Sequence, residues 1–299
     1  MPDLDADYRA LREEVGAVRL PRDFVRVSGP DALDFLDGQL SQDVKALATG
    51  ASALSLLLQP QGKVVALVRV TRSADDELLL DTDAGWGDAV VERLTRFKLR
   101  VKCDIEPTDG HCIALRGPGL AGRWHVEVGT YAAQLDWPGL TAIDLIGPDP
   151  SLPDFASECG LEAYEAVRVE AGVPMTGREL DEHTIPHEAG PWLIEQTVNF
   201  TKGCYTGQEL VARIDSRGGN VPRRLRGLIV AGGVTPSAGA VVHFDGKDSG
   251  TVTSAARSPA LGPVALAYVK RDVPVPGDVT LAWDGGEAAA QLQELPLLG

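Results

Sequence analysis

The chain has 299 residues, of which 44% are hydrophobic and 24% are charged. This composition is typical of a folded globular protein of about two domains, and it excludes collagen, a coiled coil and a disordered chain. The 28 basic and 43 acidic residues give a formal net charge of −15, so no overall basic field can attract nucleic acid. We therefore expect no direct binding of nucleic acid.

No stretch approaches 18 continuous apolar residues, so no membrane span is expected. The first fifteen residues carry five acids and no apolar centre, unlike a signal or transit peptide. The four cysteines contain no CxxC pair, which fits a reducing compartment. These features predict a cytoplasmic protein without membrane contact, and we expect a monomer.

Apolar spacing in the first part of the chain predicts a mixture of strands and helices. The segment Gln59-Pro60-Gln61-Gly62 separates two apolar runs and predicts a hairpin. In chain order the expected elements are a strand at 18–27, a helix from 29, hairpin strands at 52–58 and 63–71, a strand at 78–81, a helix at 88–97 and a strand at 98–106.

The second part continues with strands at 111–116, 124–128 and 134–137, a helix at 161–171 and irregular chain at 174–191. Short strands separated by Gly and Pro turns follow, which predicts a β-barrel or sandwich of about 75 residues. Those strands are expected at 225–230, 241–244, 247–255, 262–269 and 279–283. The resulting fold class is α+β, with a first region at 1–222, in lobes of roughly 18–107 and 108–222, and a barrel domain at 223–299.

Two motifs have the residue spacing of a functional site but not the structure that such a site requires. Residues 117–122 have the GxGxxG spacing of a dinucleotide site, but the chain that follows has the pattern of a strand instead of the required helix. His183 and His187 are four residues apart, as in a helical metal site, but Pro186 between them disfavours that helix. We expect neither a dinucleotide site nor a metal site.

The strongest local signal is Lys202-Gly203-Cys204-Tyr205-Thr206-Gly207-Gln208-Glu209. Thr206 and Glu209 have the spacing of a capping box, which would place Cys204 just before a helix. The helix dipole and Lys202 would then favour the thiolate, as in a nucleophile, a redox thiol or a soft-metal ligand. A buried, inert cysteine at a helix start is the alternative.

Two further features indicate ligand binding less specifically. Arg217, Arg223, Arg224 and Arg226 form a basic cluster that could hold a carboxylate or phosphate, or could be a solvated junction. Glu170 ends an apolar helix and could be a buried carboxylate that accepts hydrogen bonds from the edge of a heterocycle.

The segment at 202–209 resembles the KGCYxGQE signature of the YgfZ family, the folate-binding relatives of the glycine cleavage T-protein, an aminomethyltransferase. Four further segments, at 28–36, 59–63, 168–174 and 250–254, resemble other stretches of that family. The resemblance implies a three-lobed ring with a central channel for tetrahydrofolate or a derivative, closed by the barrel. It also implies a role in iron–sulfur protein assembly or maintenance, with an effect on tRNA-modifying iron–sulfur enzymes as partners.

The same resemblance assigns site residues. Glu170 occupies the position of a T-protein glutamate that contacts the pterin. T-proteins carry an Asp-Asp pair after the glycine-rich hairpin, where this chain has Ala66 and Leu67, so help with acid–base chemistry would be missing there. The expected functional thiol is Cys204 with Lys202 beside it, and the expected folate contacts are Glu170, Tyr205, Gln208 and Arg224.

Three functions remain open at this stage. The first is a tetrahydrofolate-binding factor that supports iron–sulfur proteins through Cys204. The second is a folate-dependent one-carbon (aminomethyl) transferase, which the missing Asp pair disfavours. The third is a non-catalytic scaffold, in which Cys204→Ser would have no effect. Whether the chain is an enzyme at all is not fixed by these residues.

Overall fold

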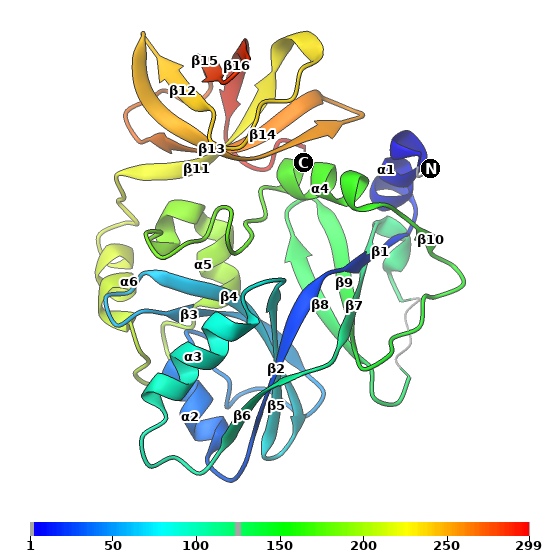
Figure 1. Ribbon diagram of the computed structural model, residues 1–299, viewed down its shortest axis with the longest axis vertical. Helices are drawn as coiled ribbons and strands as arrows, with labels where there is room; N and C mark the ends of the chain where they lie inside the picture. Colours follow the sequence, from blue (N-terminus) through cyan, green and yellow to red (C-terminus); the bar gives the residue numbers. More distant parts are fainter. Residues whose placement is uncertain (1–2, 123–126, 299) are drawn as a thin grey trace.

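The computed structural model describes residues 3–122 and 127–298, which form two sheets, a closed barrel and the helices around them (Figure 1). The first sheet has the order β3-β4-β5-β2-β6 and the second has the order β10-β1-β7-β9-β8. The first consists of β3 (Ser52–Leu58), β4 (Val64–Ala74), β5 (Glu77–Asp83), β2 (Arg22–Ser28) and β6 (Asp104–Thr108). The second consists of β10 (Ser157–Glu158), β1 (Gly16–Leu20), β7 (His111–Arg116), β9 (Leu140–Gly147) and β8 (Tyr131–Trp137).

The C-terminal strands close into a barrel in the order β11-β14-β13-β12-β15-β16, which confirms the predicted barrel. Its interior is apolar, with Leu228, Val242 and Leu281 fully buried. The barrel consists of β11 (Arg223–Val230), β14 (Gly262–Lys270), β13 (Lys247–Ser258), β12 (Val241–Phe244), β15 (Gly277–Trp283) and β16 (Gly286–Gln293).

The helices cover the sheets and join the parts. They are α1 (Leu4–Glu13), α2 (Ala32–Gln39), α3 (Gly87–Phe97), α4 (Leu161–Ala171), α5 (Pro191–Thr197) and α6 (Gln208–Asp215). Helix α4 lies between the barrel and the second sheet, because its apolar side chains share one core with residues of both (Figure 1). Helices α2 and α3 pack on one face of the first sheet, and α5 and α6 pack on the other. No helix in the described chain is long and apolar enough to cross a membrane.

Several predicted elements differ from the structure. The strand expected at 18–27 is two strands in different sheets, because Pro21 cannot donate to a ladder and the chain changes partner there. The strand expected at 98–106 is confined to β6, since Arg100 has a φ of +59°, which a strand does not accommodate. Helices α1 and α5 and strands β9 and β16 were not predicted, and most of the strand expected at 124–128 lies outside the described residues.

Candidate functional site

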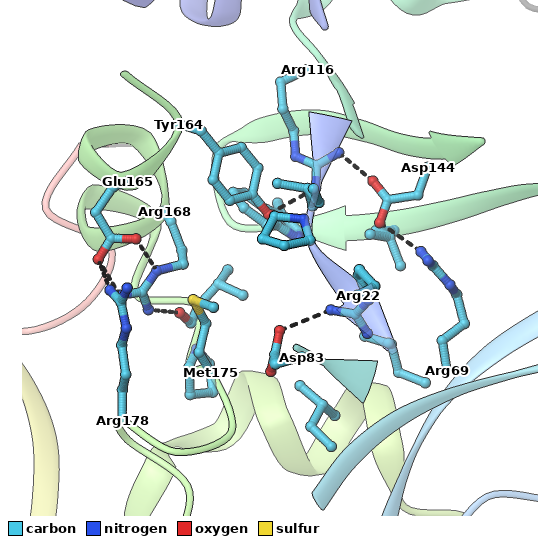
Figure 2. Close-up of a pocket in the computed structure, with 18 of the residues that line it drawn as sticks. Arg22, Arg69, Asp83, Arg116, Asp144, Tyr164, Glu165, Arg168, Met175 and Arg178 are labelled. Carbon is cyan, nitrogen blue, oxygen red and sulfur yellow. Dashed lines mark hydrogen bonds and ion pairs between the residues drawn. The ribbon is translucent and has the colours of Figure 1, made fainter. Parts of the chain in front are cut away.

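A cavity of about 210 Å³ lies where the two sheets face α4 and the chain that follows it (Figure 2). Its walls combine apolar and aromatic side chains, including Leu67, Trp137 and Trp192, with a group of charged residues. An apolar pocket with a few convergent polar groups is the usual form of a small-molecule site. We call this the central cavity; its charged lining residues are Arg22, Arg69, Asp83, Arg116, Asp144, Glu165, Arg168 and Arg178.

Asp144 joins two buried arginines on the sheet side of the central cavity. It accepts from Arg116 Nη1 at 2.7 Å and from Arg69 Nη1 at 2.5 Å. Burial alone would raise the pKa of Asp144, but the two guanidinium groups outweigh it and hold the pKa at about 2. The Arg116 guanidinium lies 4.1 Å from the centroid of the Trp137 ring, and its Nε has no hydrogen-bond partner in the described chain. The cavity therefore contains a fixed cation with one donor still unsatisfied.

Asp83, at the end of β5, places a second carboxylate on the cavity wall (Figure 2). Its Oδ1 accepts from Arg22 Nη1 at 2.9 Å, and its Oδ2 accepts from the backbone N–H of Thr176 at 2.8 Å. A carboxylate has about four acceptor positions, so these two bonds leave capacity for a ligand donor. Asp83 can therefore bind a group that presents N–H donors.

Helix α4 contributes a third polar group. Leu161, Tyr164, Glu165 and Arg168 have helical spacing and line the cavity together. The Glu165 carboxylate accepts from Arg168 Nη2 at 2.7 Å and from Arg178 Nη1 at 2.5 Å. The Arg178 side chain is 46% exposed. It is therefore more open to solvent than the other paired arginines that line the cavity.

The positions of the missing Asp pair lie on β4. Leu67 faces the central cavity, while Ala66 points to the core of the first sheet. An acid at Leu67 would have projected into the cavity, but here an apolar side chain stands there. The acid that is missing at position 67 would therefore have been part of the cavity wall.

Glu170 lies on a different face of α4 and is not part of the cavity lining. Its buried carboxylate accepts from Tyr8 Oη at 3.0 Å and from Arg12 Nη2 at 2.5 Å, both on α1. Its backbone carbonyl accepts from Leu297 N–H at 2.7 Å. The structure thus gives Glu170 partners within the protein, and an acceptor for a heterocycle in the cavity has to come from another residue.

The loop that carries Cys204 is held by Lys202. The Lys202 Nζ donates to Asp37 Oδ1 at 2.9 Å and to the carbonyl oxygens of Asp37, Leu40 and Gln42 at 2.6, 3.1 and 2.7 Å. The Lys202 ammonium therefore makes all of these hydrogen bonds with the C-terminal end of α2 and the residues just after it. Cys204 itself is exposed, in contrast to the other three cysteines, so a buried, inert cysteine is excluded at this position.

The helix start after Cys204 differs from the predicted capping box. Gly207, in a left-handed conformation with φ +86°, is the N-cap of α6 and makes no side-chain cap bond. The Thr206 hydroxyl instead lies 3.3 Å from Gln39 Oε1. The prediction of a Thr206–Glu209 capping box is wrong because the packing of the loop against α2 takes the threonine away from the helix.

The predicted site residues thus lie in three places: the loop at 202–209 with the start of α6, the start of the barrel, and α4. Tyr205 is buried, and burial raises the pKa of its hydroxyl to about 12; Gln208 begins α6. Arg224 donates to the carbonyl oxygen of Gly219 at 2.9 Å at the start of the barrel. None of residues 202–209 and neither Arg224 nor Glu170 lines the central cavity as the structure describes it. No cluster of three or more metal-ligating side chains occurs in the described residues.

The cavity residues Asp83, Arg116 and Asp144 were not found from the sequence. A signal was present, since Arg69 and Arg116 each follow directly on an apolar run within a strand, where a charge is seldom buried without a partner. Arg69 pairs with Asp81 on the neighbouring strand β5, but the acid that both arginines share, Asp144, lies on β9, so the sequence pattern alone does not show that pairing.

These observations define an α+β fold in which two sheets and α4 surround a largely apolar cavity with charged residues in its wall, and in which the barrel packs against α4. Residues 2–121 match the GCVT N-terminal domain, and residues 223–298 match the glycine cleavage T-protein C-terminal barrel domain. The segment 202–209 lies outside both ranges.

Individual relatives agree with these matches. An aminomethyltransferase of Streptomyces avermitilis is 28% identical over 320 aligned positions, which cover 93% of this chain and 84% of that protein. An uncharacterized protein of Haemophilus influenzae is 27% identical over 199 aligned positions, which cover 66% of this chain and 67% of that protein. The crystal structure of aminomethyltransferase T of the glycine cleavage system from Bartonella henselae superimposes with a TM-score of 0.79 at 22% identity, over 99% of this chain and 89% of that one.

The chain therefore carries both domains of the glycine cleavage T-protein family and has the T-protein fold.

Proposed function

We propose that the protein is a YgfZ-type factor: it binds a reduced folate in the central cavity and supports iron–sulfur proteins in the cytoplasm through the exposed thiol of Cys204. The observation that carries the folate part is the central cavity itself, in a chain with both T-protein domains. The thiol part is carried by the loop at 202–209, which presents Cys204 at the surface.

The residues of the central cavity fit a pterin. The 2-amino group and ring N–H of a pterin need an acceptor, and Asp83 has acceptor capacity left on the wall. The Arg116 Nε, buried without a partner, could donate to a ring carbonyl or ring nitrogen. Trp137 and Trp192 supply flat apolar surface, and Arg178 near solvent can pair with the carboxylates of the glutamate tail. When bound, folate would supply one-carbon chemistry; the chain's own residues would bind and orient it.

Aminomethyl transfer is less well supported than binding alone. The position at which an acid would reach the cavity is Leu67, which can neither move a proton nor stabilise developing charge. The charged groups that remain, Asp144 and Arg69 among them, are already paired with each other. The cavity is therefore better suited to holding folate than to transferring a group from it.

Titration calorimetry with 5-formyltetrahydrofolate tests the folate part. Arg178→Gln should weaken binding about fivefold, since a half-exposed ion pair contributes about 1 kcal/mol. Arg26→Gln is the matched control, because Arg26 is exposed to a similar degree, 47%, but lies outside the cavity. No binding at high micromolar folate would remove this part of the proposal, and formation of 5,10-methylenetetrahydrofolate with an aminomethyl donor would favour the transferase.

Genetic complementation tests the thiol part. Cells that lack their YgfZ-type protein would express the wild-type chain or Cys204→Ser at equal levels, and the product of an iron–sulfur tRNA-thiolating enzyme would be measured. We expect rescue by the wild type only. Rescue by both would show that the thiol is dispensable.

A further inference from the structure

A second and larger cavity of about 670 Å³ runs along α3, outside the central cavity. One wall consists of Trp86, which precedes α3, and of Arg93, Arg96 and Phe97 on the helix. The facing walls are the hairpin at 59–61 and the chain at 181–183. We call this cavity the α3 groove; its size is in the usual range for small-molecule sites.

Arg93 is a buried cation without a counter-ion. Its side chain donates through Nε and Nη2 to the carbonyl oxygen of Leu58 at 3.0 and 2.8 Å, and through Nη1 to Gln39 Oε1 at 3.1 Å. It is only 8% exposed, yet no carboxylate of residues 3–122 or 127–298 forms an ion pair with it. The fully buried arginines behave differently: Arg69, Arg116 and Arg168 are each paired with an acid.

A buried charge without a partner is costly, so the groove favours an anion that restores the pairing. Burial and the neighbouring Arg96 lower the pKa of Arg93 to about 10, so it is still a cation at neutral pH. A guanidinium has five N–H groups, and the three bonds above leave two for a ligand. Arg96 adds a second, exposed cation on the same wall.

The rest of the groove limits the kind of anion. Trp86 and Phe97 give aromatic surface, and the Arg93 guanidinium lies 3.8 Å from the centroid of the Phe97 ring. Three acids also line the groove, namely Glu92, Asp181 and Glu182, and they would repel a highly charged ligand. Asp181 is bonded within its own turn, and Glu182 lies 3.6 Å from His183 Nε2. The lining therefore suits one anionic group attached to a flat apolar body.

We propose that the α3 groove binds a small aromatic carboxylate or phosphate monoester, whose anionic group pairs with Arg93 and Arg96 while its ring contacts Trp86 and Phe97. This site is separate from the central cavity and does not depend on folate binding. It is linked to the Cys204 loop, because Gln39 Oε1 accepts from Arg93 and also lies 3.3 Å from the Thr206 hydroxyl.

Fluorine NMR of the full chain labelled with fluorotryptophan tests the site, with the Trp86 resonance assigned by Trp86→Phe. The probes are 2-naphthoate, 2-naphthyl phosphate and the neutral 2-naphthamide. We expect an anionic probe to shift the Trp86 resonance and to bind at least about tenfold more tightly than the amide. The more tightly bound anion decides between a carboxylate and a phosphate ligand.

Variants assign the charge contribution. Arg93→Met should abolish binding, and Arg96→Gln, at an exposed position that tolerates change, should weaken it about threefold to tenfold. Lys102→Gln is the matched control, because Lys102 is an exposed cation outside the groove, and it should bind as tightly as the wild type. If Arg93→Met does not fold, the affinity of Arg96→Gln and the comparison of the anionic probes with 2-naphthamide still test the proposal.

The proposal is overturned if the amide binds as tightly as both anions, if millimolar anion leaves Trp86 unmoved, or if Arg96→Gln has no effect. Folate binding is read separately from Trp137 and Trp192 in the central cavity, so failure at one site does not imply failure at the other.

Discussion

Gly62 and Gly207 pack backbone against backbone, so that the hairpin at 59–62 and the loop of Cys204 form one unit. A Cβ on Gly62 would lie 2.9 Å from the carbonyl oxygen of Gly207, and a Cβ on Gly207 would lie 2.7 Å from that of Gln59. Both glycines have a positive φ, +81° and +86°. Two segments that are far apart in the chain and that both resemble the same family thus depend on each other for their geometry.

Gly207→Ala should therefore destabilise the protein by about 2 kcal/mol or more, since a side chain there combines left-handed strain with a backbone clash. Urea unfolding measures the change. Gly203→Ala is the control in the same loop, because a Cβ at Gly203 meets no atom within 4 Å and its φ is not positive; it should change stability by less than about 0.5 kcal/mol. Equal effects of the two substitutions would show that the contact is unimportant.

The fold class, the barrel, the hairpin at 59–62 and the loop of Cys204 could all be predicted from the sequence, because apolar periodicity and turn residues are local signals. The split at Pro21 was missed because apolar residues continue across it, and only pairing with two different sheets separates β1 from β2. The motif at 202–209 singled out Cys204, which the structure shows to be exposed. The central cavity was not found, because the partners of Asp144 lie on other strands and a pairing across strands leaves no local pattern.

Cys204 should be the one thiol of the four that is alkylated quickly in the native protein. Burial raises the pKa of Cys112 to about 12 and that of Cys159 to about 11, and it also raises the pKa of Cys103. At pH 8 a thiol with a pKa near 12 is ionised in only about one molecule in ten thousand. Mass spectrometry after a short iodoacetamide pulse measures each site, and Cys204→Ser should remove the fast reaction. Equal rates at all four cysteines would contradict the exposure difference.

Lys202 should stabilise the position of the Cys204 loop and should not increase the reactivity of the Cys204 thiol. Lys202→Met leaves Asp37 and three carbonyl oxygens without their donor, so we expect a loss of about 3 kcal/mol in the free energy of unfolding. Lys45→Met is the control, since Lys45 pairs with Asp34 at the exposed surface and its loss should change the free energy of unfolding far less than Lys202→Met does.

The alkylation rate of Cys204 in the Lys202→Met variant, measured in conditions where the variant is folded, separates the two roles. It should not decrease. A rate at least tenfold lower would mean that the Lys202 charge activates the thiol and that the hydrogen bonds to α2 are secondary.

Glu170 should matter for stability and not for folate affinity. Glu170→Gln leaves Arg12 without its acid beside Tyr8, and breaking a buried pair in this way costs about 3 kcal/mol. Arg12→Met should have a similar effect because it removes the other partner. The affinity for 5-formyltetrahydrofolate should stay within about twofold of the wild type in both variants, whereas Asp83→Asn should weaken it at least about fivefold. Loss of folate binding in Glu170→Gln but not in Arg12→Met would restore Glu170 as a ligand contact.

Asp144 should make stability depend on acid pH. Its pKa is about 2 in the folded protein against 3.8 in the ordinary case, so its ion pairs stabilise the fold above about pH 4 and are lost as the pH falls toward 2. The lost contribution is about 2 kcal/mol. Asp144→Asn cannot show this loss, although it is less stable at pH 7 by about 3 kcal/mol because Arg116 is left without its acid and Arg69 keeps only Asp81.

The measurement is urea unfolding at a series of pH values from 7 down to 2, for the wild type and Asp144→Asn. The gap in the free energy of unfolding should be constant from pH 7 to about pH 5 and should then shrink by about 2 kcal/mol, because only the wild type takes up a proton at this position. Asp75→Asn is the control, since the Asp75 side chain is 94% exposed and its gap should stay near zero throughout. A gap for Asp144→Asn that stays constant down to pH 2 would mean that Arg69 and Arg116 do not lower the pKa of this carboxyl.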